Sequence, residues 1–192
     1  MSADDWKVAN QLFQIIETLD RIVFSDEDSC LAPATIVLAT NPPPDKDHYI
    51  EYSHPEYHIF VPGIAQHLQN AAKGKLILLA ESFEPEELPD LTIDALIVGI
   101  AAHEVRHRLQ HFIPKNCWFS PGSSPKDGYM EKVVKFVDRL FHYDPPRGSF
   151  HKEFDAKVIE FAAIEYYWRA TQQGKTLKAI IPCLAEIIGK LP

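Results

Sequence analysis

The amino-acid sequence predicts an α+β fold with one small sheet. A segment of helical pattern opens the chain, three strand-like segments lie between residues 34 and 62, and helical patterns dominate from residue 92 onward. A helix followed by a few strands and then by helices is typical of the α+β class. The 192 residues fit one domain, 1–192, which is long enough to bury a core without cross-links.

Apolar side chains at helical spacing, together with start and stop signals, predict six helices. They cover residues 4–24, 63–74, 92–112, 128–142, 149–173 and 177–190. We expect Gly74 to end the second helix and Pro114 to stop the third. Residues 75–82 (KLILLAES) fit either a strand or a buried helical turn, because the period of a short apolar run does not distinguish the two.

Three short segments rich in β-branched or aromatic residues predict strands. They are residues 34–40, 48–53 and 57–62. The first is stopped by the turn sequence NPPPD, and the other two flank His54 and Pro55 as in a hairpin. The sheet is therefore predicted to contain a hairpin and one further strand.

Composition and charge narrow the range of partners. The formal net charge of −8 argues against a nucleic-acid backbone or an anionic membrane, because both favour clusters of Lys and Arg. The N-terminus lacks the basic start of a secretory signal, and the longest apolar run, 95–102, is too short to cross a bilayer. The three scattered cysteines, Cys30, Cys117 and Cys183, favour a reducing compartment over a disulfide framework. We expect a soluble, cytoplasmic protein.

The chemistry of the protein is indicated by HEVRH, residues 103–107, within the third predicted helix. His103 and His107 are four residues apart, so their imidazoles lie on one helix face and can reach the same ion. Neutral imidazole suits zinc, and a catalytic zinc site takes three protein ligands and a water. Glu104 lies beside the ion, where it can take a proton from that water and pass it to a leaving amine.

HEVRH resembles the signature of the zincin metallopeptidases. That resemblance implies a small mixed β-sheet packed on an active-site helix, with additional helices following toward the C-terminus. It also implies a zinc cofactor and a peptide or protein substrate. The metzincin subgroup does not fit, because its glycine is missing and His111 lies eight residues after His103. That spacing is about 12 Å along a helix, too far to share one ion, so we expect His111 at the surface or next to a ligand rather than on the ion.

The segment HKEFDA, residues 151–156, is similar to the third-ligand motif of the gluzincin subgroup. The resemblance implies Glu153 as the third zinc ligand, with Asp155 near enough to orient a zinc-binding histidine. The subgroup often has an aspartate four residues after the ligand, and here that position is Lys157. A shift of half a turn would instead make His151 the ligand and Asp155 its partner.

The substrate side is less specified. Residues 51–62 are the candidate for a sheet edge that could accept an extended peptide, because proline is tolerated at an edge. Peptide hydrolysis also needs a hydrogen-bond donor for the oxyanion that develops on the substrate carbonyl. Five residues near the third-ligand segment could supply it, and the sequence favours none of them: Tyr143, Arg147, His151, Tyr166 and Tyr167.

Two alternatives to a zinc peptidase remain. One is a zincin-like binding or regulatory module without proteolytic activity. The other is a helical protein that binds no metal and whose histidines are incidental. Glu104 favours the enzyme, because a purely structural site gains nothing from an acid there and prefers four protein ligands.

Overall fold

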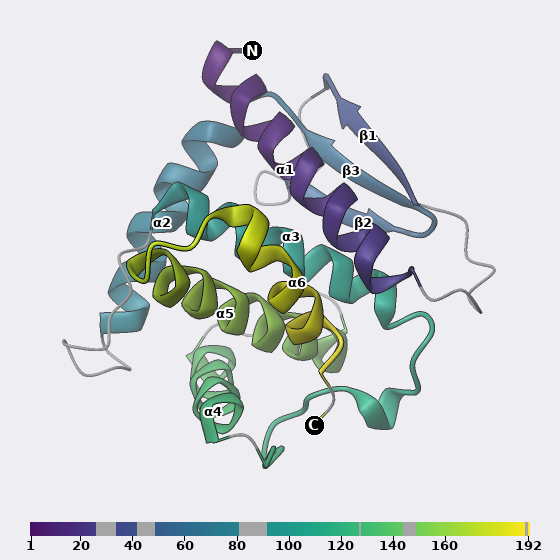
Figure 1. Ribbon diagram of the computed structural model, residues 1–192, viewed down its shortest axis with the longest axis vertical. Coiled ribbons are helices and arrows are strands. Elements are labelled where there is room, and N and C mark those ends of the chain that lie inside the picture. Colours follow the sequence, from purple (N-terminus) through teal and green to yellow (C-terminus); the bar gives the residue numbers. More distant parts are fainter. Residues whose placement is uncertain (26–33, 42–48, 81–91, 127, 144–148, 191) are drawn as a thin grey trace.

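The computed structural model describes residues 1–25, 34–41, 49–80, 92–126, 128–143, 149–190 and 192, without the side chains of 74–80 and 143. Within them lie six α-helices and three strands, which confirms the α+β class (Figure 1). The helices are α1 (Ala3–Val23), α2 (Ile64–Ala80), α3 (Ile93–Leu109), α4 (Gly128–Tyr143), α5 (Phe150–Gln172) and α6 (Leu177–Ile188). The strands are β1 (Thr35–Ala39), β2 (Ile50–Ser53) and β3 (Glu56–Phe60).

The three described strands form a mixed sheet in the order β1-β3-β2. β3 pairs in parallel with β1 and antiparallel with β2, and the β2–β3 hairpin turns through a cis His54-Pro55 bond. The hairpin predicted from the sequence is therefore confirmed. The expectation that residues 51–62 form an edge holds for β2 but is wrong for β3, which is the central strand because β1 pairs with its other side.

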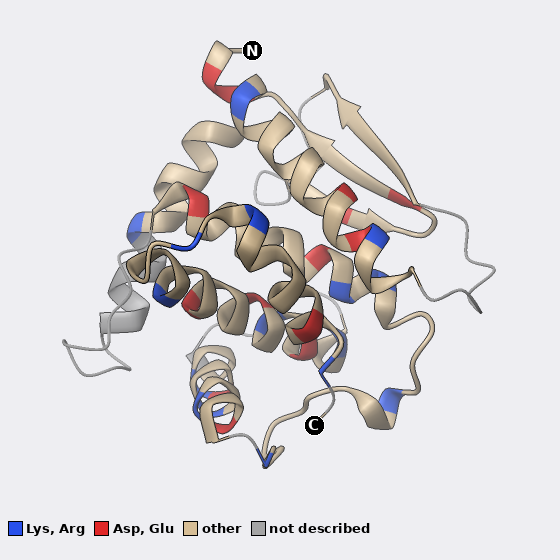
Figure 2. Ribbon diagram, in the orientation of Figure 1, with Lys and Arg blue, Asp and Glu red and all other residues tan. Residues whose placement is uncertain are grey.

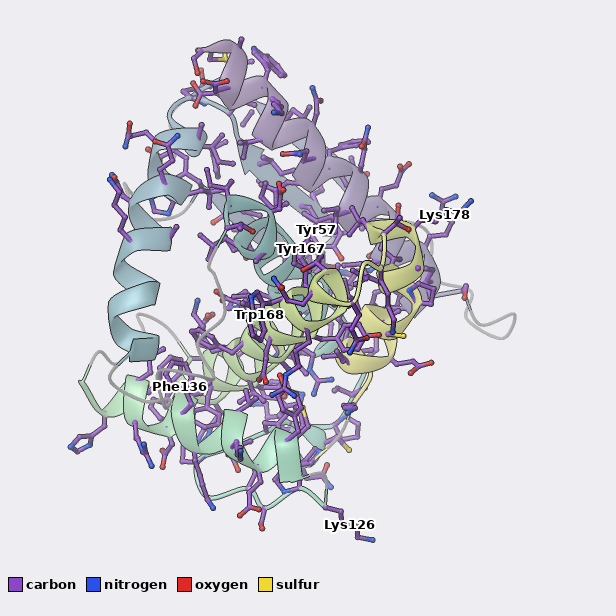
Figure 3. All side chains as sticks on the ribbon, turned by 60° about the vertical axis from the view of Figure 1, so that its left-hand side comes forward. Tyr57, Lys126, Phe136, Tyr167, Trp168 and Lys178 are labelled. Carbon is purple, nitrogen blue, oxygen red and sulfur yellow. The ribbon has the colours of Figure 1, made fainter. Side chains whose placement is uncertain are left out.

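Helix α1 begins with a capping box, in which the Ser2 hydroxyl accepts from the Asp5 amide and the Asp5 carboxylate accepts from the Ser2 amide. Its buried apolar side chains form one helical face, as the sequence predicts. This face lets α1 lie beside the sheet and pack against α3 and α6 (Figure 1). Tyr57 of β3 is fully buried next to this layer, whereas Lys126 projects from the surface (Figure 3).

Helix α3 is the centre of the molecule. It is capped by the Thr92 hydroxyl, which accepts from the Ala95 amide, and it packs against α5, α1, β2, α6 and α2. Nearly every residue from Ala95 to Arg108 is buried, so the helix has no solvent face. This surrounding of α3 explains why the segment leading into HEVRH is apolar at consecutive positions, and why polar groups on α3 need partners inside the protein.

The prediction for Gly74 is wrong. Helix α2 continues through it to Ala80, which also shows that residues 75–80 are helical and not a strand. A glycine inside a helix costs only about 1 kcal/mol relative to alanine, so it weakens a helix without having to end it. Helices α4, α5 and α6 match their predicted ranges closely.

Charged residues are distributed over many elements. Among the described residues, Lys and Arg are interspersed with Asp and Glu and do not gather in one stripe in this view (Figure 2). None of the described helices has both the length and the continuous hydropathy that a bilayer-spanning segment requires.

Candidate metal centre

The two histidines of HEVRH lie one turn apart on the same face of α3. Their ring centroids are 4.5 Å apart with the planes perpendicular, and both residues are buried. Each ring presents its Nε2 to Glu153 in the first turn of α5. His103 Nε2 lies 3.5 Å from Glu153 Oε2, and His107 Nε2 lies 3.3 Å from Glu153 Oε1. The possible ligand atoms of the three residues all lie within 4.8 Å of one another.

This cluster comprises the three residues proposed as ligands from the sequence. The alternative third ligand, His151, is exposed and stacks edge-on against Phe150, and it is not part of the cluster. The structure therefore brings Glu153, and not His151, next to the two histidines. Because α3 and α5 are the most closely packed pair of elements, the carboxylate reaches the histidines across a helix–helix contact.

The Nδ1 atoms of both rings face acceptors on the side away from Glu153. His107 Nδ1 is 2.9 Å from Gln110 Oε1. His103 Nδ1 lies 3.2 Å from Glu160 Oε2, although the two atoms are not aligned for a hydrogen bond. Lys157 Nζ donates to the same Glu160 oxygen at 2.5 Å. Acceptors at Nδ1 favour a neutral ring that keeps its proton there and leaves Nε2 free for an ion.

Asp155 was expected to orient a histidine directly, and it does so only through Gln110. Gln110 Nε2 donates to Asp155 Oδ2 at 2.6 Å and to the Lys152 carbonyl at 2.9 Å. Asp155 is fully buried and is paired with Arg106, whose Nε and Nη2 donate to its two oxygens at 2.7 and 2.8 Å. The Phe119 amide also donates to Asp155, so this carboxylate has four donors.

Arg106 connects this network to the last helix. Its Nη1 donates to the carbonyls of Ile188 and Lys190, at 2.7 and 3.0 Å. The side chain is fully buried, and a buried guanidinium requires such partners because desolvation of an unpaired charge is costly. The end of α6 is thereby tied to the helix that carries both histidines.

Glu104 is buried between α3 and the edge strand. Its Oε2 accepts from the Tyr52 backbone N–H at 2.7 Å. Burial raises the pKa of Glu104 to about 7, against the lowering effects of the His107 charge and the Tyr52 hydrogen bond. A carboxyl group with a pKa near neutrality can exchange a proton with a reacting group at physiological pH.

The electrostatics of the cluster favour neutral imidazole at one position and a charged carboxylate opposite. Burial and the neighbouring His107 lower the pKa of His103 to about 3. For Glu153, burial raises the pKa, but the adjacent His103 and His107 rings outweigh this effect and hold the pKa well below its usual range. For His107, burial lowers the pKa, while the Glu153 and Glu104 carboxylates raise it, with a net increase.

The other histidines and tyrosines lie apart from the cluster. As expected, His111 is exposed, where it stacks on His54 and contacts the edge of Tyr52. Tyr166 and Tyr167 lie toward the C-terminal end of α5, about 20 Å along the helix from Glu153. There Tyr166 interacts with Cys183, and Tyr167 lies beside Asp94. The Tyr143 side chain and Arg147 lie outside the described residues, as does Cys30.

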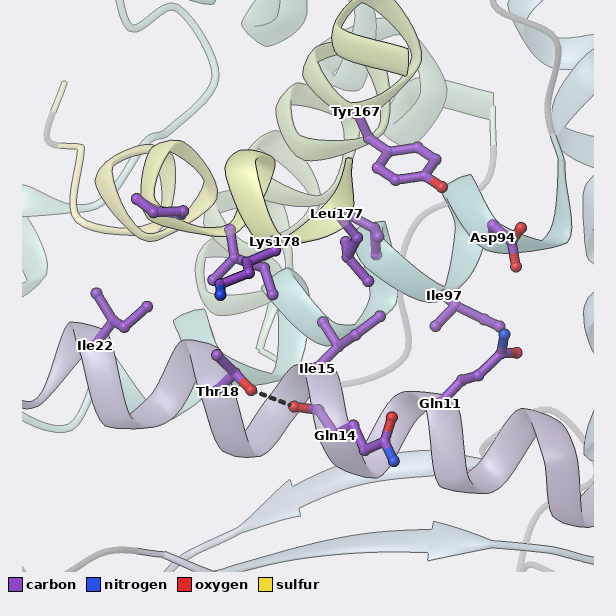
Figure 4. Close-up of a pocket in the computed structure, with 13 residues that line it drawn as sticks. Gln11, Gln14, Ile15, Thr18, Ile22, Asp94, Ile97, Tyr167, Leu177 and Lys178 are labelled. Carbon is purple, nitrogen blue, oxygen red and sulfur yellow. Dashed lines mark hydrogen bonds between the residues drawn. The ribbon is translucent and has the colours of Figure 1, made fainter. Parts of the chain in front are cut away.

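A cavity of about 650 Å³ lies between α1, α3, α5 and α6 (Figure 4). Its walls include Ile15, Ile97 and Ile181, with Lys178 and Asp94 among its polar residues. None of the three clustered residues lines it. The cavity is therefore separate from the candidate metal centre.

The comparisons with known proteins leave the site to be judged on its own geometry. Comparison with protein-family models, with curated protein sequences and with solved structures finds no match. The sequence pattern proposed His103, Glu104, His107 and Glu153 as site residues, and it did not point to Gln110 and Glu160, which contact the two histidines. Glu160 could have been found from its position seven residues after Glu153, which places it on the same face of α5.

Proposed function

We propose that this protein is a zinc-dependent metallopeptidase of the zincin type, with zinc bound by His103, His107 and Glu153. The observation that carries the proposal is the convergence of two imidazole Nε2 atoms and one carboxylate from two different helices. Two neutral imidazoles and a carboxylate are a donor set that zinc accepts, and they leave a fourth position for water. The hydrogen bond between His107 Nδ1 and Gln110 supports this fit, because it orients the His107 Nε2 toward the common point.

Zinc, when bound, supplies Lewis acidity that polarises a substrate carbonyl and lowers the pKa of a water. Glu104 then acts as the general base that takes a proton from the attacking water and passes it to the leaving amine. Its Oε2 is held by Tyr52 N–H, which fixes the carboxyl group beside the cluster and leaves Oε1 to receive the proton.

The position of the sheet favours a peptide as substrate. β2 is an edge strand of the described sheet, and its contact with Glu104 places that edge next to the base. An extended peptide can pair with an open strand edge through backbone hydrogen bonds. A small mixed sheet beside the helix that carries the histidines is also the arrangement that the zincin resemblance implies.

A binding or regulatory module with an inactive centre is the second candidate. It is favoured by the same Tyr52–Glu104 hydrogen bond, because an outward backbone donor of the edge strand is already in use. In that case the ion would stabilise the fold and the cleft would hold a partner without cleaving it.

One set of variants separates these two functions. We expect the purified protein to contain one zinc, Glu104→Gln to keep it, and His103→Ala to lose it, as measured by elemental analysis. We expect Glu104→Gln to lower the hydrolysis rate of a peptide library by about 10²–10⁴-fold, the usual contribution of a general base. The exposed Glu17 of α1 provides the matched control, Glu17→Gln, with unchanged activity. Zinc binding without any hydrolysis in the native protein would support the second candidate, and a fully active Glu104→Gln would exclude Glu104 as the base.

A further inference from the structure

We propose that Gln110 is a positioning residue that fixes the proton of His107 on Nδ1 and thereby keeps Nε2 unprotonated for a metal ion. The proposal extends the zinc centre proposed above and rests on it only where metal affinity is concerned. Gln110 follows the last residue of α3, is 5 % exposed, and contacts His107 and Asp155 at once. The position of the His107 proton follows from the orientation of the Gln110 amide, whose oxygen and nitrogen face different partners.

The amide orientation is set by two acceptors. Gln110 Nε2 lies 2.6 Å from Asp155 Oδ2 and 2.9 Å from the carbonyl oxygen of Lys152. A carboxylate and a carbonyl accept hydrogen bonds and donate none, so both N–H groups of the amide are used there. In the opposite orientation the amide oxygen would face two acceptors, and its NH₂ group would lose both of these bonds. Oε1 must therefore be the end that faces His107.

The acceptors are themselves held in place. Asp155 receives two hydrogen bonds from Arg106 and one from the Phe119 amide, and both Asp155 and Arg106 are fully buried. Arg106 is fixed in turn by the carbonyls of Ile188 and Lys190. Rotation of Asp155 away from Gln110 would break this buried pair, which is strongly destabilising. The amide orientation is thus determined by residues from α3, α5 and the end of α6.

The tautomer of His107 follows. Oε1 of Gln110 lies 2.9 Å from Nδ1, at hydrogen-bond distance, whereas the nearest Glu153 oxygen is 3.3 Å from Nε2. The shorter contact with an acceptor assigns the proton of a neutral His107 to Nδ1. Its Nε2 lone pair then points toward Glu153, whose Oε1 is 3.3 Å away. In this tautomer His107 Nε2 is unprotonated before any ion binds. Asp155 contacts the Gln110 amide, and the amide contacts the histidine, so a neutral group relays the effect of the buried carboxylate.

The tautomer can be measured without metal. In the chelator-treated native protein, at a pH where the ring is neutral, we expect imidazole ¹⁵N shifts and couplings to show His107 protonated at Nδ1. In Gln110→Met, a side chain of similar volume without a strong acceptor, we expect the Nε2–H form to appear, since Glu153 can then accept that proton. A native His107 protonated at Nε2 would overturn the proposal, and this measurement decides it even where the variant does not fold.

Metal affinity provides the second readout. We expect Gln110→Met to weaken zinc binding about 10–100-fold in competition with a chromophoric chelator, the usual effect of losing the hydrogen-bond partner of a metal ligand. Val134→Ala, a buried change in α4, is the control for general destabilisation and should keep native affinity. Native affinity in Gln110→Met would contradict the positioning role. Absence of zinc binding by a native protein with His107 protonated at Nδ1 would refute the proposed function while leaving the tautomer assignment intact.

Discussion

At the residue scale, the buried polar groups on α3 each have specific partners, and these partners lie on other elements. Arg108 donates to Asp20 of α1, and its guanidinium lies 4.2 Å from the Phe24 ring centroid. Asp20 also accepts from the Tyr57 hydroxyl at 2.6 Å. One carboxylate thus connects the first helix, the central strand and the helix of the candidate metal centre.

We predict that Asp20→Ala lowers the free energy of unfolding by about 3–5 kcal/mol, because it removes a buried carboxylate that accepts from both Arg108 and Tyr57. Tyr57→Phe, which removes only a hydroxyl, should cost about 1 kcal/mol. Urea unfolding followed by circular dichroism measures both. Glu131→Ala breaks the exposed Lys135–Glu131 pair and should cost less than about 0.5 kcal/mol. An Asp20→Ala protein as stable as this control would show that the Asp20 network contributes little.

The candidate site was predictable from the sequence where its residues are constrained by local spacing. His103, Glu104 and His107 follow from helical geometry, and Glu153 follows from a local motif. Gln110 was not predictable, because its role depends on Asp155, which is 45 residues away on α5. The contact of Lys157 was not predictable for a similar reason: it donates to Glu160, whose carboxylate also lies next to His103 on the neighbouring helix.

At the element scale, the contact between α3 and α5 brings the two halves of the centre together. Gly99 lies at this contact, and a Cβ built there would lie 2.5 Å from Ile164 Cγ1 and 3.2 Å from the Glu160 carbonyl oxygen. Ile164 is itself buried, so it has little space to move. The close approach of the helices therefore requires the absence of a side chain at this position.

We predict that Gly99→Ala destabilises the protein by about 1–3 kcal/mol through overpacking, although alanine is intrinsically better than glycine in a helix by about 1 kcal/mol. Urea unfolding tests whether the free energy of unfolding of Gly99→Ala is lower or higher than that of the native protein. Gly189→Ala is the matched control, since its Cβ would meet its neighbours only at 3.6 Å or more, and it should be neutral or slightly stabilising. A stabilised Gly99→Ala would mean that α3 and α5 can separate without cost.

The limits of sequence prediction also differ by element. Helices with one apolar face, such as α1 and α4, were found with nearly correct bounds because burial on one side imposes a period. The predicted end of the second helix at Gly74 was wrong, because a glycine weakens a helix locally without having to end it. The order β1-β3-β2 was not predictable, because the parallel pairing of β1 with β3 depends on where the rest of the fold places β1.

At the scale of the whole molecule, the proposed metal centre predicts a thermodynamic coupling between ion binding and the fold. The three proposed ligands come from α3 and α5, while their partners extend through Arg106 to the carbonyls of Ile188 and Lys190. An unfolded polypeptide does not hold these groups together, so an ion that binds the folded state selectively stabilises it.

We predict that zinc at 100 times its Kd raises the free energy of unfolding of the metal-free protein by about 2.7 kcal/mol. Excess chelator should reverse the increase, and His103→Ala should abolish it, whereas the exposed His111→Ala should keep it. Thermal and urea unfolding at fixed zinc concentration measure the effect. An equal response in the native protein and in His103→Ala would place the ion elsewhere.

The same increment should depend on pH with a definite sign. Zinc binds the unprotonated imidazole nitrogen, so protons compete with it mainly at His107, whose pKa is raised above the ordinary histidine value, whereas the lowered pKa of His103 keeps that ring neutral over this range. We therefore expect the zinc-dependent increase in Tm to be full near pH 8 and to diminish as the pH is lowered toward 5. The metal-free protein measured at each pH separates this loss from acid destabilisation of the fold itself. A zinc effect of constant size between pH 8 and pH 5 would contradict ligation by His107, because a neutral His103 and the carboxylates would keep their affinity over most of that range.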